Sequence, residues 1–271
     1  MTMSEPGTEG PGATENIPLT GEHVLLVLPA YNEEESLPAL FERVIETRRI
    51  NGRDLRIVLV DDGSRDATAD VAEGFSHRLP VEVVRHPQNK GLGEAIKSGL
   101  LRAAELAHPQ DVIVTMDADD THPPALIERM VRLIHEGNDV VIASRYRYGA
   151  RVIGLSPFRM FISAAAALLF RTLLPIAGVR DFTCGYRAYR AEILQRVTRR
   201  SVEQLVSRSG FECMVEILLR LDNEGAIIRE VPLILRYDQK RGASKMDVLG
   251  TSLRTLKLLL AWRVRRWTER R

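Results

Sequence analysis

Hydrophobic residues follow two alternating patterns along this chain from His23 onward. Short runs such as "HVLLVLP" and "DVIVTMD" are apolar at nearly every position and rich in β-branched residues, which is typical of strands buried on both faces. Between them lie longer segments whose apolar residues recur every three or four positions, the spacing of amphipathic helices. The predicted strands cover 23–29, 55–61, 81–85, 111–117 and 139–145, and the predicted helices cover 33–48, 66–78, 91–107 and 123–136.

This alternation of strands and helices predicts an α/β fold with a mainly parallel sheet that is covered by helices on both faces. Ligands of such sheets bind beyond the carboxyl ends of the strands. Four of the predicted strands end in "PAYNEEE", "DDGSRDAT", "RHPQNKGLG" and "DADDTHPP". Carboxylates, an amide, a lysine and several glycines therefore meet at one edge of the sheet, and we expect the functional site there.

From Arg145 onward, the regular alternation of strands and helices no longer holds. We expect helices at 157–174, 191–197 and 210–221, a strand-like segment at 226–237 and a final helix at 248–269. The first residues, 1–21, are rich in Gly, Pro, Thr and Glu and predict a disordered tail. The expected organisation is thus this tail, a catalytic domain at 22–245 and a basic amphipathic helix at 246–271.

Composition and charge exclude several classes of protein. With 271 residues and a formal net charge of +2, the chain lacks the basic excess of a nucleic-acid-binding protein. Cys184 and Cys213 have neither metal-ligand spacing nor the density of a secreted disulfide scaffold, and we interpret both as small core residues. The N-terminus does not resemble a signal peptide, and the apolar stretch at 158–179 is interrupted by Arg171 and Pro175. We expect a peripheral protein on the cytoplasmic side of a membrane.

Paired carboxylates follow the fourth predicted strand. In extended geometry Asp117 and Asp119 point the same way, so both can reach one point beyond the strand end. Two such oxygens suit a hard divalent cation, Mg²⁺ or Mn²⁺, whose remaining ligands are water and substrate phosphates. By the same alternation Asp120 points away from Asp117 and Asp119. It either has a role in the site or caps the helix at Pro123 and Pro124.

Two further loops carry candidate ligand contacts. In "DDGSRDAT", Asp61 can accept hydrogen bonds from a nucleobase or a ribose hydroxyl, while Gly63, Ser64 and Asp66 shape a turn and cap a helix. In "NKGLGEA", Lys90 offers a positive charge to a phosphate and the glycines let backbone amides approach it, although a plain turn explains the same residues.

Together these motifs resemble those of the dolichyl- or polyprenyl-phosphate mannosyltransferases, which are family 2 glycosyltransferases of GT-A fold. The resemblance covers about residues 22–250 and rests on the motifs above together with "ASRY", "RMFIS", "DFTCGYRAYR", "GFECMVEILLR" and "GASKM", which occur in the family's order.

The resemblance implies roles for particular residues. It implies nucleotide-sugar contacts at Pro29, Tyr31, Asn32, Glu33, Asp61, Lys90, Gly91, Asp117 and Lys245. It implies metal ligands at Asp117 and Asp119, with Thr121 at a third position where relatives often carry Gln. It implies that Arg145, Arg159 and Ser163 hold the acceptor phosphate, and that Asp119, Arg145 and Arg159 are the catalytic residues.

The implied reaction moves a sugar, most simply mannose from GDP-mannose, onto the phosphate of a polyprenol with inversion. A lipid phosphate is already ionised at neutral pH and needs no general base, which explains guanidinium groups in an acidic site. The alternatives are a family 2 transferase that uses a UDP-sugar or a hydroxyl acceptor, and a nucleotide-binding regulatory subunit without turnover. Processive relatives carry a QxxRW motif, and Arg263 stands at its first position here, so polymerisation is not expected.

If the acceptor lies in a membrane, we expect the chain to contain a segment that contacts the membrane. Leu249, Leu253, Leu256, Leu260, Val264 and Trp267 recur at steps of three or four with basic residues between them. This pattern is typical of a helix in the lipid interface, and equally of a helix that packs on the core with a solvated basic face. The stretch at 158–176 could form a second apolar surface toward lipid.

Overall fold

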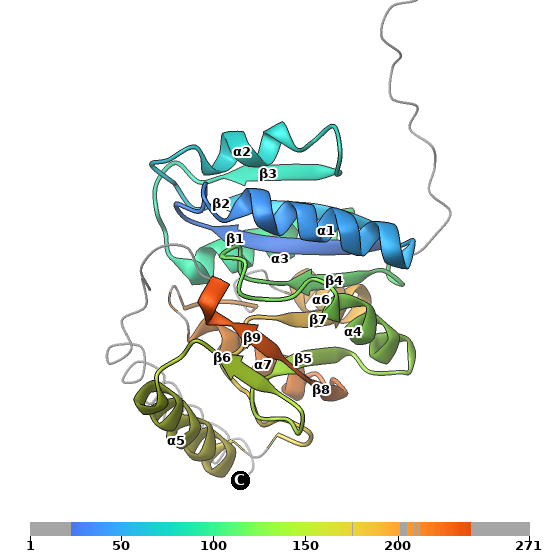
Figure 1. Cartoon of the computed structure of the whole chain (residues 1–271). Coiled ribbons are helices and arrows are strands. Elements are labelled where there is room, and N and C mark those ends of the chain that lie inside the picture. The colour runs from blue at the N-terminus through green and yellow to red at the C-terminus, as the bar shows by residue number, and fades with distance from the viewer. Residues whose placement is uncertain (1–22, 175, 201–204, 209, 211, 240–271) are drawn as a thin grey trace, which may run out of the picture.

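The computed structural model describes residues 23–174, 176–200, 205–208, 210 and 212–239. The expected tail at 1–21, the expected helix at 246–271 and Lys245 lie outside these residues. A seven-stranded sheet forms the centre of the molecule (Figure 1), with strand order β3-β2-β1-β4-β7-β5-β8. Its strands are β1 (His23–Ala30), β2 (Asp54–Asp61), β3 (Val81–Arg85), β4 (Val112–Thr115), β5 (Val140–Ser144), β7 (Arg187–Arg190) and β8 (Ile228–Pro232).

Helices cover both faces of this sheet, as expected. In Figure 1, α1 and α4 lie on one face, and α3, α6 and α7 lie on the other. The helices are α1 (Leu37–Asn51), α2 (Thr68–Gly74), α3 (Leu92–Leu106), α4 (Leu126–His135), α5 (Pro157–Leu173), α6 (Ala191–Arg200) and α7 (Cys213–Asn223). The α5 helix stands apart at one end of the molecule. The fold class predicted from the hydrophobic pattern is confirmed.

Strand β7 is a feature that the sequence did not predict. It runs antiparallel between β4 and β5, where Ile113 faces Tyr189 and Val141 faces Ala188. Every other pairing in the sheet is parallel. The strand comes from "GYRAYR", whose arginines and tyrosines do not form the apolar run of a central strand. Arg187 is nevertheless fully buried, because its guanidinium donates to the backbone carbonyls of three neighbouring residues, Phe182, Cys184 and Met214.

The segment expected as one strand at 226–237 divides into two. Its first part, β8, extends the main sheet, and its second part, β9 (Ile234–Arg236), pairs in parallel with β6 (Arg151–Ile153) in a separate two-stranded sheet. The division falls at Leu233, which donates to Ser144 O on one side and accepts from Arg151 N–H on the other. Both bonds hold the small sheet against the carboxyl end of β5.

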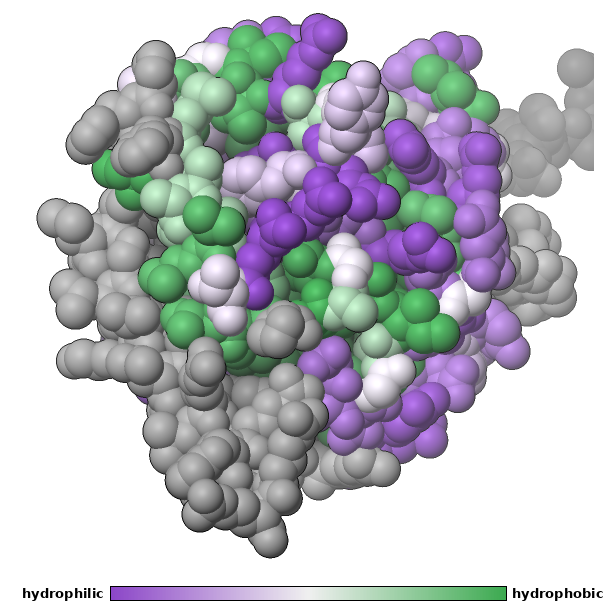
Figure 2. All heavy atoms as spheres, turned by 90° about the horizontal axis from the view of Figure 1, so that it is seen from below, coloured by the Kyte–Doolittle hydropathy of each residue, from purple (hydrophilic) through white to green (hydrophobic). Residues whose placement is uncertain are grey.

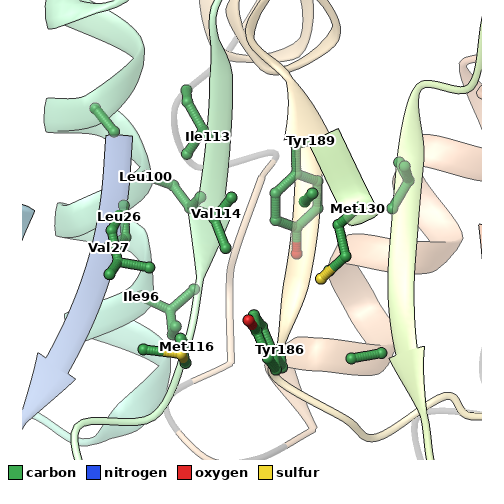
Figure 3. Packing of buried hydrophobic residues seen from close by; sticks show 14 of the residues in the cluster. Leu26, Val27, Ile96, Leu100, Ile113, Val114, Met116, Met130, Tyr186 and Tyr189 are labelled. Carbon is green, nitrogen blue, oxygen red and sulfur yellow. The ribbon is translucent and has the colours of Figure 1, made fainter. Parts of the chain in front are cut away.

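The core fills the space between the sheet and its helices. Figure 3 shows Ile96 and Leu100 of α3 beside β1 and β4, whose side chains Val27 and Val114 lie close to them. All four side chains are at most 2% exposed. Gly99 faces Val27, where an added Cβ would lie 2.4 Å from a side-chain methyl, so α3 approaches β1 closely. This packing fixes the strands whose carboxyl ends carry the site.

The two cysteines lie in this core, as predicted. Cys184 and Cys213 are both free and buried, and burial raises the pKa of each thiol to about 12. Both groups therefore stay protonated at neutral pH and act as small apolar residues. Among the helices in the described ranges, none is long and apolar enough to cross a membrane.

Several helices begin later than the periodicity predicted, and α1 and α4 show this most clearly. The α1 helix begins at Leu37 rather than Glu33, because the backbone N–H groups of Asn32, Glu33 and Glu34 donate to side chains of the loop after β2. The α4 helix begins at Leu126 rather than Pro123, with Ala125 as its N-cap and no side-chain cap. The capping interpretation of Asp120 is therefore wrong.

Candidate active site

The loops after β1 and β2 form one hydrogen-bonded wall. Asn32 N–H donates to Ser64 Oγ at 2.9 Å, and Arg65 N–H donates back to Asn32 Oδ1 at 2.8 Å. Glu33 N–H donates to Thr68 Oγ1 at 2.8 Å. Asn32 has a φ of 53°, a conformation that Asn tolerates better than most residues. The residues expected to contact the nucleotide, Pro29, Tyr31, Asn32 and Glu33, thus belong to a rigid segment beside Asp61.

The loop after β3 packs against this wall at Gly63. This glycine has a φ of 70°, and an added Cβ would lie 2.4 Å from the backbone carbonyl carbon of Gln88. Asp61 is buried at the end of β2, and its Oδ1 accepts a hydrogen bond from Ser64 N–H at 2.9 Å. The carboxylate therefore shapes the turn and stands at the edge where the expected ligand would bind.

Replacing Gly63 by Ala should destabilise the fold and weaken donor binding, since the new methyl group meets backbone atoms that cannot rotate away. Gly52 is a matched control, because its φ is 63° and no atom lies within 4 Å of an added Cβ. Backbone strain of roughly 1–2 kcal/mol is common to both variants. Urea unfolding should show a clearly larger loss for Gly63→Ala, and equal losses would contradict the close packing of these loops.

Asp62 organises the loop that carries Lys90 and Gly91, a role that the sequence did not predict. Its two oxygens accept the N–H groups of Lys90 at 2.9 Å and Gly91 at 2.8 Å. The same carboxylate lies 2.7 Å from Nδ1 of buried His86, whose Nε2 lies 2.9 Å from Ser98 Oγ on α3. The paired Asp in "VDD" was the only signal for this role. The Lys90 side chain is exposed above the loop.

The loop after β4 carries the predicted metal ligands. Strand β4 ends at Thr115, two residues before Asp117, so strand alternation does not set the directions of Asp117 and Asp119 as expected. Hydrogen bonds within the loop do so instead. Asp119 is buried, and its Oδ1 accepts from Thr121 N–H at 3.2 Å and from Thr121 Oγ1 at 2.7 Å. Thr121 thus orients a predicted ligand, while its own role as a third ligand stays a prediction.

Asp117 is the more open of the two carboxylates, with 44% of its side chain exposed. Its backbone N–H donates to Nδ1 of buried His122 at 3.3 Å, and the His122 ring lies against Tyr186 with 5.1 Å between ring centroids. Gly185 lies close to the carboxylate, because an added Cβ there would come 3.4 Å from Asp117 Oδ1. The backbone at Asp117 is therefore fixed by buried rings while its carboxylate faces outward.

Asp120 links the loop to α1. It has a φ of 62°, and its Oδ2 forms an ion pair with Arg43 Nη2 at 3.1 Å. Arg43 Nη1 also donates to Gln239 Oε1 at 2.8 Å. Arg236 N–H donates to Thr121 O at 3.0 Å. The segment that leads into the predicted basic turn is therefore held against the loop of Asp117 and Asp119.

The residues present fit a divalent cation that is completed by substrate. Among the described residues, no group of three or more His, Cys, Asp and Glu side chains could hold a metal ion alone. Asp117 and Asp119 supply hard oxygen donors in one loop, which suits Mg²⁺ or Mn²⁺ ligated also by phosphate and water. The sheet order β3-β2-β1-β4 places this loop next to the three loops described above.

Arg145 follows β5 and is tightly paired with Asp181. Its Nε and Nη2 donate to the two oxygens of Asp181 at 2.8 and 2.7 Å, and Nη2 also donates to Thr183 Oγ1 at 2.6 Å. Asp181 is 0% exposed, whereas 19% of the Arg145 side chain is exposed. Burial alone would raise the pKa of Asp181, but the charge and hydrogen bonds of Arg145 outweigh burial and lower it.

A second buried carboxylate supports this pair. Glu230 Oε1 accepts the N–H groups of Arg180 at 2.6 Å and Asp181 at 2.7 Å. Burial raises the pKa of Glu230 despite these bonds, and the charge of Asp181 raises it further. Nothing in the sequence near Glu230 indicated this role, because Glu230 lies 49 positions from Asp181 in the chain.

The other residues expected at the acceptor phosphate lie on α5. Ser163 Oγ lies 2.6 Å from the hydroxyl of Tyr146, and the Arg145 guanidinium carbon lies 5.4 Å from the centre of the Tyr146 ring. Tyr146 therefore connects Ser163 to Arg145. Arg159 lies in the first turn of α5, and its side chain is outside the described part of the chain, as is Lys245. The predicted roles of Arg145, Arg159 and Ser163 in holding the acceptor phosphate stay predictions.

Known proteins resemble this chain in sequence and in fold. Residues 25–198 match the model of the family named glycosyl transferase family 2. The polyprenol monophosphomannose synthase of Mycolicibacterium smegmatis is 33% identical over 97% of this chain and 96% of its own length. The dolichol-phosphate mannosyltransferase of Pyrococcus furiosus is 34% identical over 88% of this chain, which spans 64% of that relative's length.

A crystal structure of glucosyl-3-phosphoglycerate synthase from Mycobacterium tuberculosis, in complex with Mn²⁺, UDP and glucosyl-3-phosphoglycerate, superposes with a TM-score of 0.61. It shares 23% sequence identity and covers 90% of this chain and 80% of that one. This likeness confirms the expected GT-A fold. The family match spans well over half of the chain, and the chain belongs to glycosyl transferase family 2.

Proposed function

We propose that this protein transfers mannose from GDP-mannose to the phosphate of a polyprenol, with inversion at the anomeric carbon and with Mg²⁺ or Mn²⁺ as cofactor. The observation that carries the proposal is the arrangement of the carboxylate loop of Asp117 and Asp119 between the β1–β3 loops and the Arg145 segment. Relatives named for mannose transfer to dolichol phosphate and polyprenol support the substrates.

The donor would lie along the loops after β1, β2 and β3. Asp61 would accept hydrogen bonds from the base or ribose, and Lys90 would place its charge near the phosphates. The loop that presents Lys90 is shaped by Asp62, so its backbone is preorganised before the donor binds. Asp117 and Asp119 would hold the cation, which would neutralise charge on the departing diphosphate.

The acceptor phosphate would approach from the side of Arg145. Two of its guanidinium nitrogens are occupied by Asp181, and Nη1 makes no hydrogen bond to any described residue. Asp181 therefore fixes the guanidinium plane and leaves one edge for an incoming phosphate oxygen. No base is required, because the acceptor is already an anion. The site would have to hold the acceptor phosphate and the donor diphosphate next to each other, in an orientation that allows the acceptor oxygen to attack.

A transfer assay with a panel of nucleotide sugars tests this proposal. The full chain, Mn²⁺ or Mg²⁺ and a short polyprenyl phosphate in detergent should yield a lipid-linked sugar from GDP-mannose. Transfer only from UDP-glucose would favour the alternative donor, and transfer only to a hydroxyl acceptor would favour another family 2 activity. Donor binding without turnover on any acceptor would favour the regulatory subunit.

We also propose that a membrane surface is a partner, with α5 as a contact. Several large apolar residues on this helix are exposed, including Leu168 at 61% and Leu169 at 46%. Figure 2 views the end of the molecule that carries α5, and hydrophobic residues gather on that side of the face. Moving such residues from water into the lipid interface lowers the free energy of the protein.

Changing Leu168 and Leu169 together to Ser should weaken binding to lipid vesicles by about 30-fold, given roughly 1 kcal/mol for each partly buried leucine. The fold should be unaffected, because both side chains are exposed. Ile50→Ser is the control, since Ile50 is 68% exposed on α1. Vesicle flotation measures both variants, and an equal response would place the contact away from α5.

A further inference from the structure

A basic cavity lies beside α5, next to the predicted acceptor site. Its volume is about 410 Å³, and it lies between the end of α5, the loop that follows and the segment after β5. The residues that define its chemistry are Arg147, Arg171, Leu174, Ile176, Val179 and Arg180. Arg145 is not part of its lining, so the cavity is separate from the Arg145–Asp181 pair.

The charges in this cavity are not balanced. Among the described residues, no Asp or Glu lines it. Arg147, Arg171 and Arg180 make no side-chain hydrogen bond or ion pair with any described residue. Neighbouring arginines differ, since Arg145 pairs with Asp181 and Arg190 pairs with Asp139. Three guanidinium groups around one hollow repel one another, and a bound anion removes that repulsion.

The cavity also has an apolar wall. Leu174, Ile176 and Val179 are buried, whereas Arg171 is exposed on the same helix as Leu168 and Leu169. Figure 2 shows a band of hydrophilic residues across the middle of this face, beside the hydrophobic side. A ligand that combines a phosphate with hydrocarbon matches both parts. A small inorganic anion would use only the arginines.

We propose that this cavity binds the phosphodiester headgroup of an anionic phospholipid while α5 rests on the membrane. The proposal rests on the membrane contact of the proposed function and adds a lipid class to it. Guanidinium groups suit phosphate oxygens through planar, paired hydrogen bonds. The site would orient the protein, so that the Arg145 segment faces the lipid surface that carries the acceptor.

The test compares two double variants that remove the same charge. Arg171→Gln with Arg180→Gln removes two cavity arginines. Arg129→Gln with Arg229→Gln is the control, because these arginines line a neighbouring cavity and make no ion pair with a described residue. Binding of the full chain is measured on vesicles of phosphatidylcholine with and without phosphatidylglycerol, and inorganic phosphate is titrated separately.

The cavity variant should bind phosphatidylglycerol vesicles about 30-fold more weakly, as expected for two basic residues at about 1 kcal/mol each near an anionic surface. The control should change by less than a third of that, and pure phosphatidylcholine should not distinguish the variants. Equal loss in both variants would overturn the proposal in favour of general electrostatic attraction. Loss of inorganic phosphate binding alone would overturn the lipid headgroup.

Transfer to a short polyprenyl phosphate in detergent separates this proposal from the proposed function. The cavity variant should keep wild-type activity there, because no bilayer is present. Loss of that activity in the cavity variant would assign the cavity to the acceptor and overturn the proposal. Failure of the wild-type chain to transfer any sugar would refute the proposed function instead, and the vesicle result would stand on its own.

Discussion

Replacing Asp119 by Asn is expected to lower sugar transfer by a factor of at least about 10²–10³, the scale on which loss of a preorganised charge contact affects turnover. The amide keeps an oxygen that can accept the hydrogen bonds from Thr121, so the loop should retain its shape. It removes the negative charge that we assign to cation binding. Steady-state kinetics with increasing Mn²⁺ measure the loss.

The matched control is Asp238→Asn, which removes the same charge from an exposed residue of a neighbouring segment. Asp238 pairs with Arg236 at 2.8 Å at the surface, and such pairs contribute little. Its activity should remain near that of the wild type, and both variants should unfold at similar urea concentrations. A fully active Asp119→Asn protein would exclude Asp119 from the metal site.

The largest loss of stability is expected from Asp181→Ala. This change leaves the Arg145 guanidinium without its bidentate partner and removes the acceptor for Arg145 N–H and Cys184 N–H. Removing one member of a buried ion pair typically costs about 3–5 kcal/mol. Urea unfolding at neutral pH should show a loss of this size. Glu192→Ala is the control, because Glu192 forms an exposed pair with Arg196 on α6, and its loss should be below about 1 kcal/mol.

The pH dependence of this effect has a definite sign. The pKa of Asp181 is lowered in the folded protein, so its stabilisation is present above the unfolded pKa of about 3.9. It is lost as the pH falls through the lower folded pKa. The difference in unfolding free energy between wild type and Asp181→Ala should therefore narrow below about pH 4. A difference that is constant across this range would show that the ion pair is not its source.

Local patterns in the sequence predicted the parallel half of the fold well. Strand β3 has the predicted bounds, and β1 and β2 differ from prediction by one residue, because their apolar runs are long and end in turn residues. Gly63, which was expected to shape the turn after β2, has a positive φ. The clustering of four loops at one edge followed from strand order and the general rule for such sheets.

Contacts between distant segments could not be predicted in this way. Arg43 and Gln239 are 196 positions apart, and nothing in either segment alone indicates that they meet. Strand β7 lacks an apolar run, because the buried Arg187 finds backbone carbonyls that only the fold supplies. Asp62 was overlooked beside Asp61 for a related reason, since its partners Lys90 and Gly91 lie in the next loop.

The most direct test of the account is transfer of radiolabelled mannose from GDP-mannose to a short polyprenyl phosphate, with the wild type and Asp119→Asn compared in Mn²⁺ and in a chelator. The account predicts labelled lipid from the wild type with Mn²⁺ alone, and almost none from the variant or in the chelator. Equal labelling by both proteins, or labelling that persists in the chelator, would contradict it.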